Sequence, residues 1–452
     1  MRESYYTLQG RRFNELNGAV SRLSSRLSES SSSFQVEHSM RRLSDEGRKN
    51  PRAIAVASIM PPDESGIATF THSVFSRASY GVDIFTHYKS IESYLSGVHD
   101  ERLKNTNVRV FSRDCLPFAR AIVSYDAELY VLGNSAHHLP LISSLRSLAH
   151  FRTRNPTFVY IHDPFLFNIF KLFCKSQGFD FTAFLALQYP ECAEFLLTKN
   201  YDGDNHDLAR RSIFALRPIL HDIPLDGAIV NSASAKAFVE KDLPHLAGNR
   251  VFQLFHPVFP CPSAEYVAEP RAFRIGTFGV PGQAKCTEMV IDAFRELRRE
   301  FPDVELVIAG FDVGQYSVRC GVWREKGIII EESPSDERLI ALMKSCHVAV
   351  QLRQFNLGES SGCVPQLLAA DVPVIVSDIG SFSEYGKAVR AIPADAAVHD
   401  LLEAIKGEAF NQGRRRLARA AYVRDHTPEK FCDSLMDLIS NGATSSVAAA
   451  CI

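Results

Sequence analysis

The chain has 452 residues, so two domains of roughly 150–200 residues each, with terminal segments, are expected. The net charge is −2 and acidic and basic residues are interspersed, which argues against a nucleic-acid-binding protein. The ten cysteines form no CxxC pair and indicate reduced thiols in a cytoplasmic protein. The sequence starts without the apolar core of a signal peptide, and no uncharged apolar run is long enough to span a membrane.

Residues 1–50 are polar and rich in serine. The stretch from Ser21 to Ser33 contains eight serines and no aromatic residue. This composition cannot bury much apolar surface, so it predicts a flexible N-terminal arm, to which we assign no function.

The first domain begins with the apolar run Ala53–Ile59, which is typical of a parallel strand buried on both faces. Pro61 and Pro62 end this strand, and Gly66 opens a helix. These residues are candidates for a ligand-binding loop, and the alternative is a plain strand-to-helix turn. Helical patterns separate the later strands, so residues 51–262 are predicted to form a doubly wound α/β domain. These further strands are expected at 82–88, 129–133, 158–162 and 227–231.

Polar residues follow two of these strands directly. Asn134 ends one strand and leads to His138, and the next strand ends in His162, Asp163 and Pro164. In open parallel sheets ligands bind at the carboxyl ends of the strands, which makes His138, His162 and Asp163 candidate site residues. The alternative is that these histidines are structural.

The segment 165–187 contains seven phenylalanines at helical spacing. This spacing favours buried core, with a face for an acceptor lipid or a membrane surface as the alternative. A proline-bearing stretch from Phe255 to Pro270 is the best candidate for a linker between domains.

Residues 263–427 repeat the α/β pattern and predict a second domain of the same kind. Its expected strands are 273–279, 305–310, 328–332, 347–352, 372–377 and 389–392. The loop from Gly279 to Lys285, after the first of them, is neither a Walker loop nor GxGxxG, which argues against an NAD-dependent dehydrogenase. A lysine after a glycine loop at a helix start can still neutralise a diphosphate.

A polar loop, residues 358–366, lies between two buried strands and opens a helix. Ser360, Ser361 and Gly362 are small enough to let a phosphate reach the free amides there. Glu359 is an unusual choice for phosphate alone but suits a ligand that also carries sugar hydroxyls. The loop therefore favours a nucleotide-sugar, with an ordinary surface acid beside a helix cap as the alternative.

These residues resemble a known motif. Glu359 to Gly362, with Gln366 and the run Leu368–Val376, is similar to the donor-sugar motif of group 1 (family 4-like) glycosyltransferases of GT-B fold, in the bacterial Gly-Glu-Ser-Ser-Gly subset. The Pro-Pro…Ser-Gly-Ile-Ala, Gly-Asn…His and His-Asp-Pro motifs of the first domain match in the same order. Two positions depart from the family: Gln366 stands where a second acid is usual, and Val280 lies where an arginine precedes the lysine.

The resemblance implies an α/β GT-B architecture, two Rossmann-like domains facing a central cleft. It implies transfer of a hexosyl group from a nucleoside diphosphate sugar to an acceptor hydroxyl, with retention of configuration, in polysaccharide, lipopolysaccharide or glycoconjugate synthesis. Lys285, the 360–362 amides and the Gly66 loop would stabilise the diphosphate. Glu359 would hold the sugar hydroxyls, and His162 would face the sugar from the opposite wall.

Further residues follow from the same resemblance. Gln366 would contact the donor, and Arg353, just before the loop, is a candidate for the missing arginine. Residues 428–440 would form a helix that packs back on the first domain, followed by a tail at 441–452.

No metal or other cofactor is expected, because helix N-termini and Lys285 supply positive charge. The Asp202-Gly203-Asp204 triplet, which could bind a metal in another glycosyltransferase fold, is interpreted as a surface turn.

The expected partners are the donor and a sugar or lipid-linked sugar acceptor, with no nucleic acid. A cytoplasmic location is expected, with peripheral contact at the inner face of the membrane left open. The competing hypothesis is a catalytically silent GT-B subunit that binds a nucleotide-sugar or a partner.

Overall fold

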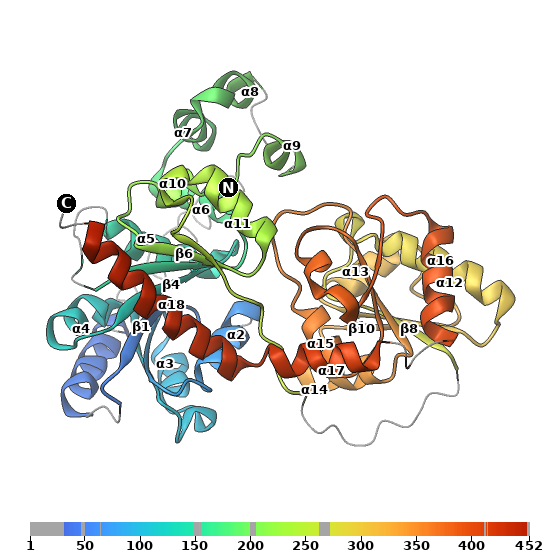
Figure 1. Ribbon diagram of the computed structural model, residues 1–452, viewed down its shortest axis with the longest axis horizontal. Coiled ribbons are helices and arrows are strands. Elements are labelled where there is room, and N and C mark those ends of the chain that lie inside the picture. The colour runs from blue at the N-terminus through green and yellow to red at the C-terminus, as the bar shows by residue number, and fades with distance from the viewer. Residues whose placement is uncertain are drawn as a thin grey trace, which may run out of the picture. The chain divides into compact units, whose positions relative to one another are not determined.

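The computed structural model describes residues 31–46, 50–63, 65–148, 153, 155–198, 205–261, 272–410, 413 and 415–449. Its chain forms two compact units. Figure 1 labels the helices and strands along the chain. The first consists of the described residues of Met1–Val131 and Phe151–Thr157, and the second of those of Leu132–His150 and Phe158–Ile452.

The N-terminal half of the chain builds a seven-stranded sheet of order β3-β2-β1-β4-β5-β6-β7. All five residues of β1 are buried, as expected for a parallel strand with both faces covered. The strands are β1 (Ala53–Ala57), β2 (Gly81–Thr86), β3 (Val108–Ser112), β4 (Ala127–Leu132), β5 (Thr157–Ile161), β6 (Gly227–Val230) and β7 (Val251–Gln253).

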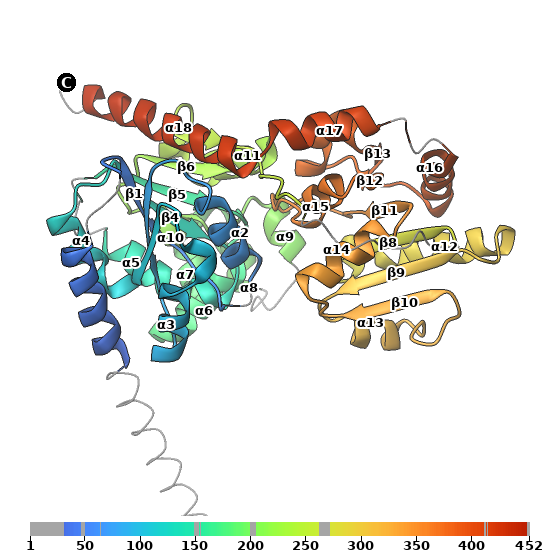
Figure 2. The same ribbon diagram turned by 90° about the horizontal axis from the view of Figure 1, so that it is seen from below.

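The C-terminal half builds a six-stranded parallel sheet of order β10-β9-β8-β11-β12-β13, which Figure 2 shows in this sequence. Its strands are β8 (Arg274–Phe278), β9 (Glu305–Gly310), β10 (Ile328–Glu332), β11 (Val348–Gln351), β12 (Val374–Ser377) and β13 (Arg390–Ile392). Along β9, Leu306 and Ile308 enter one core with helices α12 and α16, and Val307 and Ala309 enter the opposite core with α14 and α15. This alternation buries both faces of the sheet.

The helices of the first half are α2 (Gly66–Phe75), α3 (Ile91–Val98), α4 (Leu116–Ile122), α5 (Leu139–Ser147), α6 (Phe167–Gln177), α7 (Phe181–Gln188), α8 (Ala193–Thr198), α9 (Asn205–Arg210), α10 (Arg217–Leu220) and α11 (Ala233–Asp242). Those of the second half are α12 (Thr287–Glu300), α13 (Val313–Arg319), α14 (Asp336–Lys344), α15 (Cys363–Ala369), α16 (Val398–Phe410), α17 (Arg416–Asp425) and α18 (Pro428–Ala449).

The predicted fold class is confirmed: the chain has two parallel-sheet, Rossmann-like domains. Each predicted strand of the second domain is present within two residues of its expected bounds. The prediction omitted β3 and β7, because Val108–Ser112 carries an arginine and Val251–Gln253 is only three residues long.

The expected flexible arm is wrong for residues 31–45, which form a helix. The Ser39 hydroxyl lies 2.7 Å from the Tyr94 hydroxyl and accepts from the Ser112 N–H at 2.8 Å. Arg42 Nη1 donates to the Val110 carbonyl at 2.7 Å. Serines and arginines, which the composition predicted to be solvated, thus contact the edge of the first sheet. Residues 1–30 and 47–49 lie outside the described part of the chain.

The C-terminal helix α18 packs within the second unit, against residues of β5 and of the segment after β7. The Phe431 ring centre lies 5.8 Å from that of Tyr160 in β5 and 6.0 Å from that of Phe255. The described part of the expected linker is held here too, since the Val258 N–H donates to the His426 carbonyl at 2.7 Å. Helix α18 continues to Ala449, beyond the predicted end at 440; the predicted domain boundary at 262–263 and residues 450–452 lie outside the described residues.

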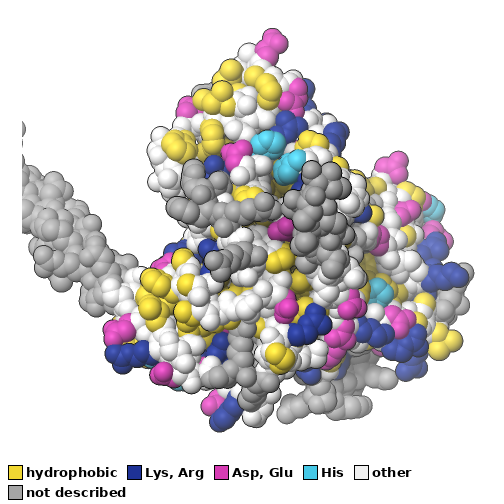
Figure 3. All heavy atoms as spheres, turned by 60° about the vertical axis from the view of Figure 1, so that its left-hand side comes forward, with side chains coloured by type: hydrophobic (Ala, Val, Ile, Leu, Met, Phe, Trp, Pro, Cys, Tyr) yellow, Lys and Arg dark blue, Asp and Glu magenta, His cyan; other side chains and the backbone are white. Residues whose placement is uncertain are grey.

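Apolar side chains are exposed around α6, α7 and α8. Phe179, Leu187 and Leu197 are 51%, 75% and 58% exposed, and Figure 3 shows hydrophobic side chains over α7 and α8 at the top of that view. Phe165, Phe167, Phe170 and Phe173 are instead buried. The phenylalanines of the segment therefore serve mainly as core, and the acceptor-lipid or membrane face stays a prediction.

Within the described ranges, no helix combines the length and the apolar character needed to cross a bilayer.

Candidate active site

Lys285 lies just after the first strand of the second sheet. β8 ends at Phe278, and a short 3-10 helix, Gln283–Lys285, precedes α12. Gly279 has φ +98°, which favours glycine, and a Cβ atom placed there would lie 3.0 Å from Lys285 Nζ. The half-buried lysine side chain therefore folds back over Gly279.

Glu359 lies on the loop between β11 and α15, at the same carboxyl-end edge of the sheet. Its Oε1 accepts from Arg353 Nε at 3.4 Å, and its Oε2 accepts from the backbone N–H two residues earlier at 3.2 Å. The Gln354 N–H donates to the Ala284 carbonyl at 2.9 Å, which joins this loop to the one that carries Lys285. The two strongest sequence candidates therefore lie on adjoining loops.

Arg353 is a buried cation of this edge, with only 8% of its surface exposed. Its backbone N–H donates to Ser377 Oγ at 2.9 Å, and its Nη1 donates to the Leu352 carbonyl at 2.9 Å. The guanidinium carbon lies 4.9 Å from the centre of the Phe382 ring. Stacking and hydrogen bonds thus hold the guanidinium in place beside Glu359.

Two cations share this edge with one carboxylate. Burial lowers the pKa of Lys285 below its ordinary value, and the positive charge of Arg353 lowers it further, while Cys363 and Glu359 act in the opposite direction. A partly desolvated lysine beside an arginine is stabilised when an anion arrives, because a nearby opposite charge favours the ammonium form. The arrangement is therefore chemically suited to a phosphate or diphosphate group.

The residues that follow Glu359 begin helix α15. Ser361 is buried, and its hydroxyl accepts from the Val364 N–H at 3.3 Å, so it caps the helix. Ser360 and Gln366 are half-buried, and Gly362 is exposed. The predicted donor contacts of these residues stay predictions, but the Ser361 hydroxyl already has a structural partner.

Gly358 brings the Glu359 loop against the end of β5. It has φ +87°, and a Cβ atom there would lie 2.3 Å from Pro164 Cγ, a contact too short for any residue but glycine. The neighbouring Asp163 accepts from the Asn134 N–H at 3.1 Å. Burial raises the pKa of Asp163 above its ordinary value, the Asn134 hydrogen bond lowers it, and the charge of Glu359 raises it.

His162 directly follows β5, and its backbone N–H donates to the Leu132 carbonyl at 2.9 Å. Its ring centre lies 4.5 Å from that of Tyr160, in an edge-on arrangement. Burial lowers the pKa of His162 well below its ordinary value, and His256 and His138 lower it further. The imidazole is therefore neutral at neutral pH, and it can donate a hydrogen bond to a sugar hydroxyl or accept one from it.

Two residues here were not predicted as site residues. Asn134 joins two elements, since its N–H binds Asp163 and its Oδ1 accepts from the Ile169 N–H at 3.1 Å. His256 lies near His162 although the sequence places it in the linker, and burial lowers its pKa to about 4. The Gly-Asn motif was a usable signal for Asn134; no sequence pattern pointed to His256.

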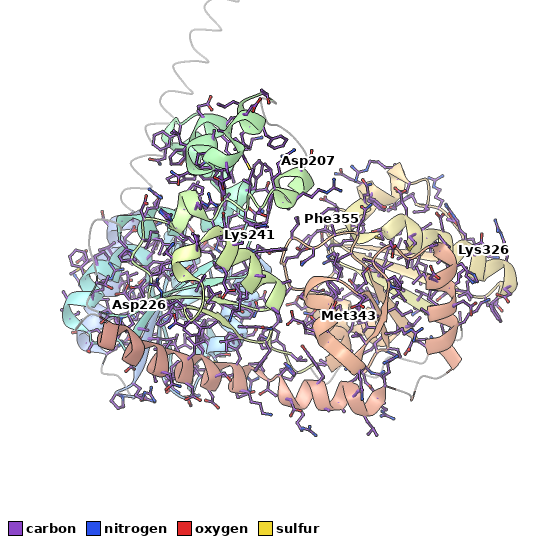
Figure 4. All side chains as sticks on the ribbon, turned by 45° about the horizontal axis from the view of Figure 1, so that its top comes forward. Asp207, Asp226, Lys241, Lys326, Met343 and Phe355 are labelled. Atoms are coloured by element: carbon purple, nitrogen blue, oxygen red, sulfur yellow. The ribbon has the colours of Figure 1, made fainter. Side chains whose placement is uncertain are left out.

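A cavity of about 810 Å³ adjoins the Lys285 loop. Figure 4 labels one of its residues, Phe355, on the loop after β11. The cavity is lined by Gln283, Ala284, Gln354, Phe355 and Asn356, together with Arg210 of α9 and Phe238 of α11. Its mixed polar and aromatic lining suits a sugar-bearing ligand.

Two further sequence candidates lie at the starts of helices. His138 is fully buried in the 3-10 turn before α5. Gly66 begins α2 in the first unit, after Ser65, whose Oγ accepts from the Ile67 N–H at 3.3 Å. The Asp202–Asp204 triplet lies outside the described residues. Across the described part of the chain, no cluster of three or more His, Cys, Asp or Glu is placed to hold a metal ion.

Part of the chain is similar in sequence to a known family. Residues 274–422 match the sequence model of a family described as glycosyl transferases group 1. No curated protein sequence matches the chain significantly. The match covers the second sheet together with the loops of Lys285 and Glu359.

Several solved structures share the fold. α,α-Trehalose 6-phosphate synthase from Burkholderia multivorans is 13% identical, with a TM-score of 0.56 over 88% of this chain and 98% of that one. Sucrose-phosphate synthase from Thermosynechococcus elongatus is 14% identical, with a TM-score of 0.55 over 87% and 100%. HepE of Anabaena, in complex with UDP-glucose, is 14% identical, with a TM-score of 0.54 over 86% and 99%. At these identities the likeness is one of fold, and that fold is GT-B.

Proposed function

We propose that this protein is a glycosyltransferase that moves a hexosyl group from a nucleoside diphosphate sugar to the hydroxyl of a sugar or lipid-linked sugar, with retention of configuration. The product would be a polysaccharide, lipopolysaccharide or glycoconjugate. Support comes from the match of residues 274–422 to group 1 glycosyl transferases and from the UDP-glucose bound by the structurally similar HepE.

The observation that carries the proposal is the joined pair of loops holding Lys285, Arg353 and Glu359. Hydrogen bonding between the loops fixes a lysine, a buried arginine and a carboxylate at one edge of the sheet. The two cations suit the diphosphate of a donor, and the carboxylate suits the hydroxyls of its sugar. A nucleoside diphosphate sugar carries both of these groups.

The proposed reaction breaks the bond between the anomeric carbon and the diphosphate oxygen. The acceptor oxygen forms the new bond to that carbon, and its proton leaves on the departing diphosphate. Lys285 and Arg353 stabilise the negative charge that grows on the diphosphate, the contribution that usually dominates such catalysis. Glu359 holds the sugar hydroxyls, and the neutral His162 is proposed to orient the same sugar.

The direct test is Glu359→Ala in a transfer assay with nucleoside diphosphate sugars. We expect transfer to be lost while circular dichroism and the melting temperature stay unchanged, because Glu359 is a half-buried loop residue and not part of either core. Equal transfer rates for the variant and the parent would refute the assignment. A parent that binds donors but shows no turnover would instead support the silent GT-B subunit.

We also propose that transfer needs no metal, because Lys285 and Arg353 provide the positive charge that a divalent cation would otherwise supply. Full activity is therefore expected after dialysis against EDTA. If EDTA abolishes transfer, and Asp202→Ala or Asp204→Ala does the same, the DxD triplet is a metal site and the proposal is wrong.

A further inference from the structure

The segment that follows β12 contacts several residues of the candidate active site. This segment, η7 (Gly380–Ala388), consists of short 3-10 turns interrupted at Gly386, where the backbone has φ +54°. It lies between β12 and β13, so it begins at the carboxyl-end edge of the second sheet. The segment η7, the Glu359 loop, β7 and α11 all belong to the second compact unit.

The first turn of η7 holds the loop that carries Arg353 and Glu359. Phe355, labelled in Figure 4, marks the position of this loop. The Ser381 hydroxyl donates to the Glu359 carbonyl at 3.0 Å, and the Phe382 ring centre lies 4.9 Å from the Arg353 guanidinium carbon. Ser381 and Phe382 are only 6% and 2% exposed. These buried contacts fix the backbone of Glu359 and the side chain of Arg353.

Gly380 adds a third contact with the same loop. It has φ +57°, and a Cβ atom placed there would lie 2.5 Å from Asn356 Cγ, which favours glycine at this position. Asn356 Oδ1 in turn accepts from the Gly358 N–H at 2.7 Å. Three consecutive residues of η7 therefore contact the loop that runs from Arg353 to Glu359.

Glu384 ties η7 to two elements of the first half of the chain. Its Oε1 accepts at 2.8 Å from the N–H of Ala233, the first residue of α11, and its Oε2 accepts from Gln253 Nε2 in β7 at 2.7 Å. Both lengths are typical of hydrogen bonds to an ionised carboxylate. A negative charge also suits the start of α11, because the first amides of a helix lack partners within it.

The two sets of contacts are close together on η7. A 3-10 helix has three residues per turn, so Ser381 and Glu384 are one turn apart on the same face. Without the Glu384 hydrogen bonds this turn would lose its anchor on α11 and β7. Ser381 and Phe382 would then move with it, and so would the loop that they hold.

We propose that Glu384 is a positioning residue of the candidate active site. It fixes η7 by binding α11 and β7, and η7 in turn holds Arg353 and Glu359 in the arrangement that binds the donor. The effect of Glu384 on transfer rests on the proposed function, whereas the coupling between η7 and the loop does not.

The test is amide hydrogen exchange of the full-length protein, which reports local opening, with transfer rates measured on the same variants. In Glu384→Ala we expect the loop 353–362 to exchange at least about fivefold faster than in the parent, and turnover at saturating donor to fall at least about fivefold. Ser381→Ala should loosen the same loop but leave exchange at the start of α11 unchanged, because its hydroxyl binds the loop.

Glu384→Gln should keep both loop exchange and turnover within about twofold of the parent. The glutamine oxygen can still accept from the Ala233 N–H. Gln253 can reverse its side-chain amide so that its oxygen accepts from the new NH2 group. Rescue by this variant separates the hydrogen bonds of Glu384 from its charge.

Glu296→Ala is the matched control. Glu296 is also an exposed glutamate, but it accepts from Arg299 of its own helix α12, at 3.1 Å. Loop exchange and turnover should stay as in the parent.

The proposal is overturned by unchanged loop exchange in Glu384→Ala, by faster exchange confined to the start of α11, or by equal loosening in Glu296→Ala. Faster loop exchange with unchanged turnover in an active enzyme would overturn it as well. A parent without turnover would refute the transferase assignment alone, because exchange of the loop 353–362 decides the coupling by itself.

Discussion

The two edges of the second sheet use similar residues in different ways. At the carboxyl-end edge, Arg353 and Glu359 are 3.4 Å apart, and nearly a third of the Glu359 side chain is exposed. At the amino-end edge, Asp371 is held by Arg416 at 3.0 Å and by Arg419 at 2.9 Å. The two hydrogen bonds of Glu359 are 3.4 and 3.2 Å long, whereas Asp371 holds its arginines at 3.0 and 2.9 Å, so the more weakly held Glu359 keeps more acceptor capacity for ligand hydroxyls.

The difference follows from which elements meet at each edge. Loops with glycines, such as Gly279 and Gly358, follow the strands at the carboxyl-end edge and let side chains and ligands approach the backbone closely. At the amino-end edge the ends of α14 and α15 meet the face of α17, so rigid helices fix the cationic groups. The two edges of one sheet thus hold their charged side chains in different ways, one on loops and one between helices.

Lys285 and Lys344, one at each edge of the sheet, allow the two edges to be tested separately. Lys285→Ala should weaken nucleoside diphosphate binding by roughly 1.5–3 kcal/mol, the loss of one charge-assisted contact. Lys344→Ala should leave that affinity unchanged, because Lys344 lies at the other edge. Calorimetry on both variants at one salt concentration measures the two effects.

Unchanged affinity in Lys285→Ala would remove the phosphate role of this lysine. Equal weakening in both variants would show that the effect comes from the overall charge of the domain and not from a site at either edge.

Gly358→Ala tests whether the carboxyl-end edge depends on close backbone contact. A non-glycine residue in the left-handed region costs about 1–2 kcal/mol, and here the new methyl group would also have to displace Pro164. Because the clash adds to the backbone cost, we expect a loss of more than about 2 kcal/mol in the free energy of unfolding, together with slower transfer, as Glu359 moves. Urea denaturation and the transfer assay measure the two effects.

Gly362→Ala in the same loop is the control. Gly362 has φ −72°, and no atom lies within 4 Å of a Cβ placed there, so stability should change by less than about 0.5 kcal/mol. If both alanine variants unfold at the same denaturant concentration as the parent, the Gly358 contact does not constrain the loop.

Much of this fold could be predicted from the sequence because its strands are short apolar runs. The runs that became β1, β9 and β12 are buried on both faces, and their hydrophobic pattern is therefore continuous and easily recognised. The helix at 31–45 could not be predicted, because its stability depends on the polar partners Tyr94, Ser112 and Val110 in distant elements.

The site residues also fall into those that the sequence predicts and those that only the structure reveals. Glu359 and Lys285 could be found because each lies in a local pattern, a small-residue loop between a strand and a helix. The contact of Gly358 with Pro164 joins residues 194 positions apart, and the pairing of Asp371 with Arg419 joins the turn after α15 to helix α17. Such contacts arise only from tertiary packing, so composition and spacing give no signal for them.

Substitution of Gln366 by glutamate should have the smallest effect on donor affinity, because stronger hydrogen bonds and charge repulsion oppose each other at this position. It is half-buried on α15, where the family pattern has an acid. A carboxylate would accept ribose hydroxyls as a charged acceptor, and charged hydrogen bonds are about twice as strong as neutral ones. A second negative group near Glu359 and the diphosphate would also repel them. We therefore expect Gln366→Glu to change donor affinity by less than about tenfold, or ~1.4 kcal/mol.

Gln366→Leu separates a ribose contact from a structural role. Leucine has nearly the same size but would leave the ribose hydroxyls facing an apolar group, so donor binding should be weaker than with either glutamine or glutamate. The measurement is the donor Kd of the three proteins at one pH and salt concentration, with melting temperatures to show that α15 is intact. If the leucine variant binds the donor as tightly as the parent, position 366 does not touch the ribose. The departure from the family motif would then have no bearing on donor binding, and the carboxyl-end edge would rely on Lys285, Arg353 and Glu359.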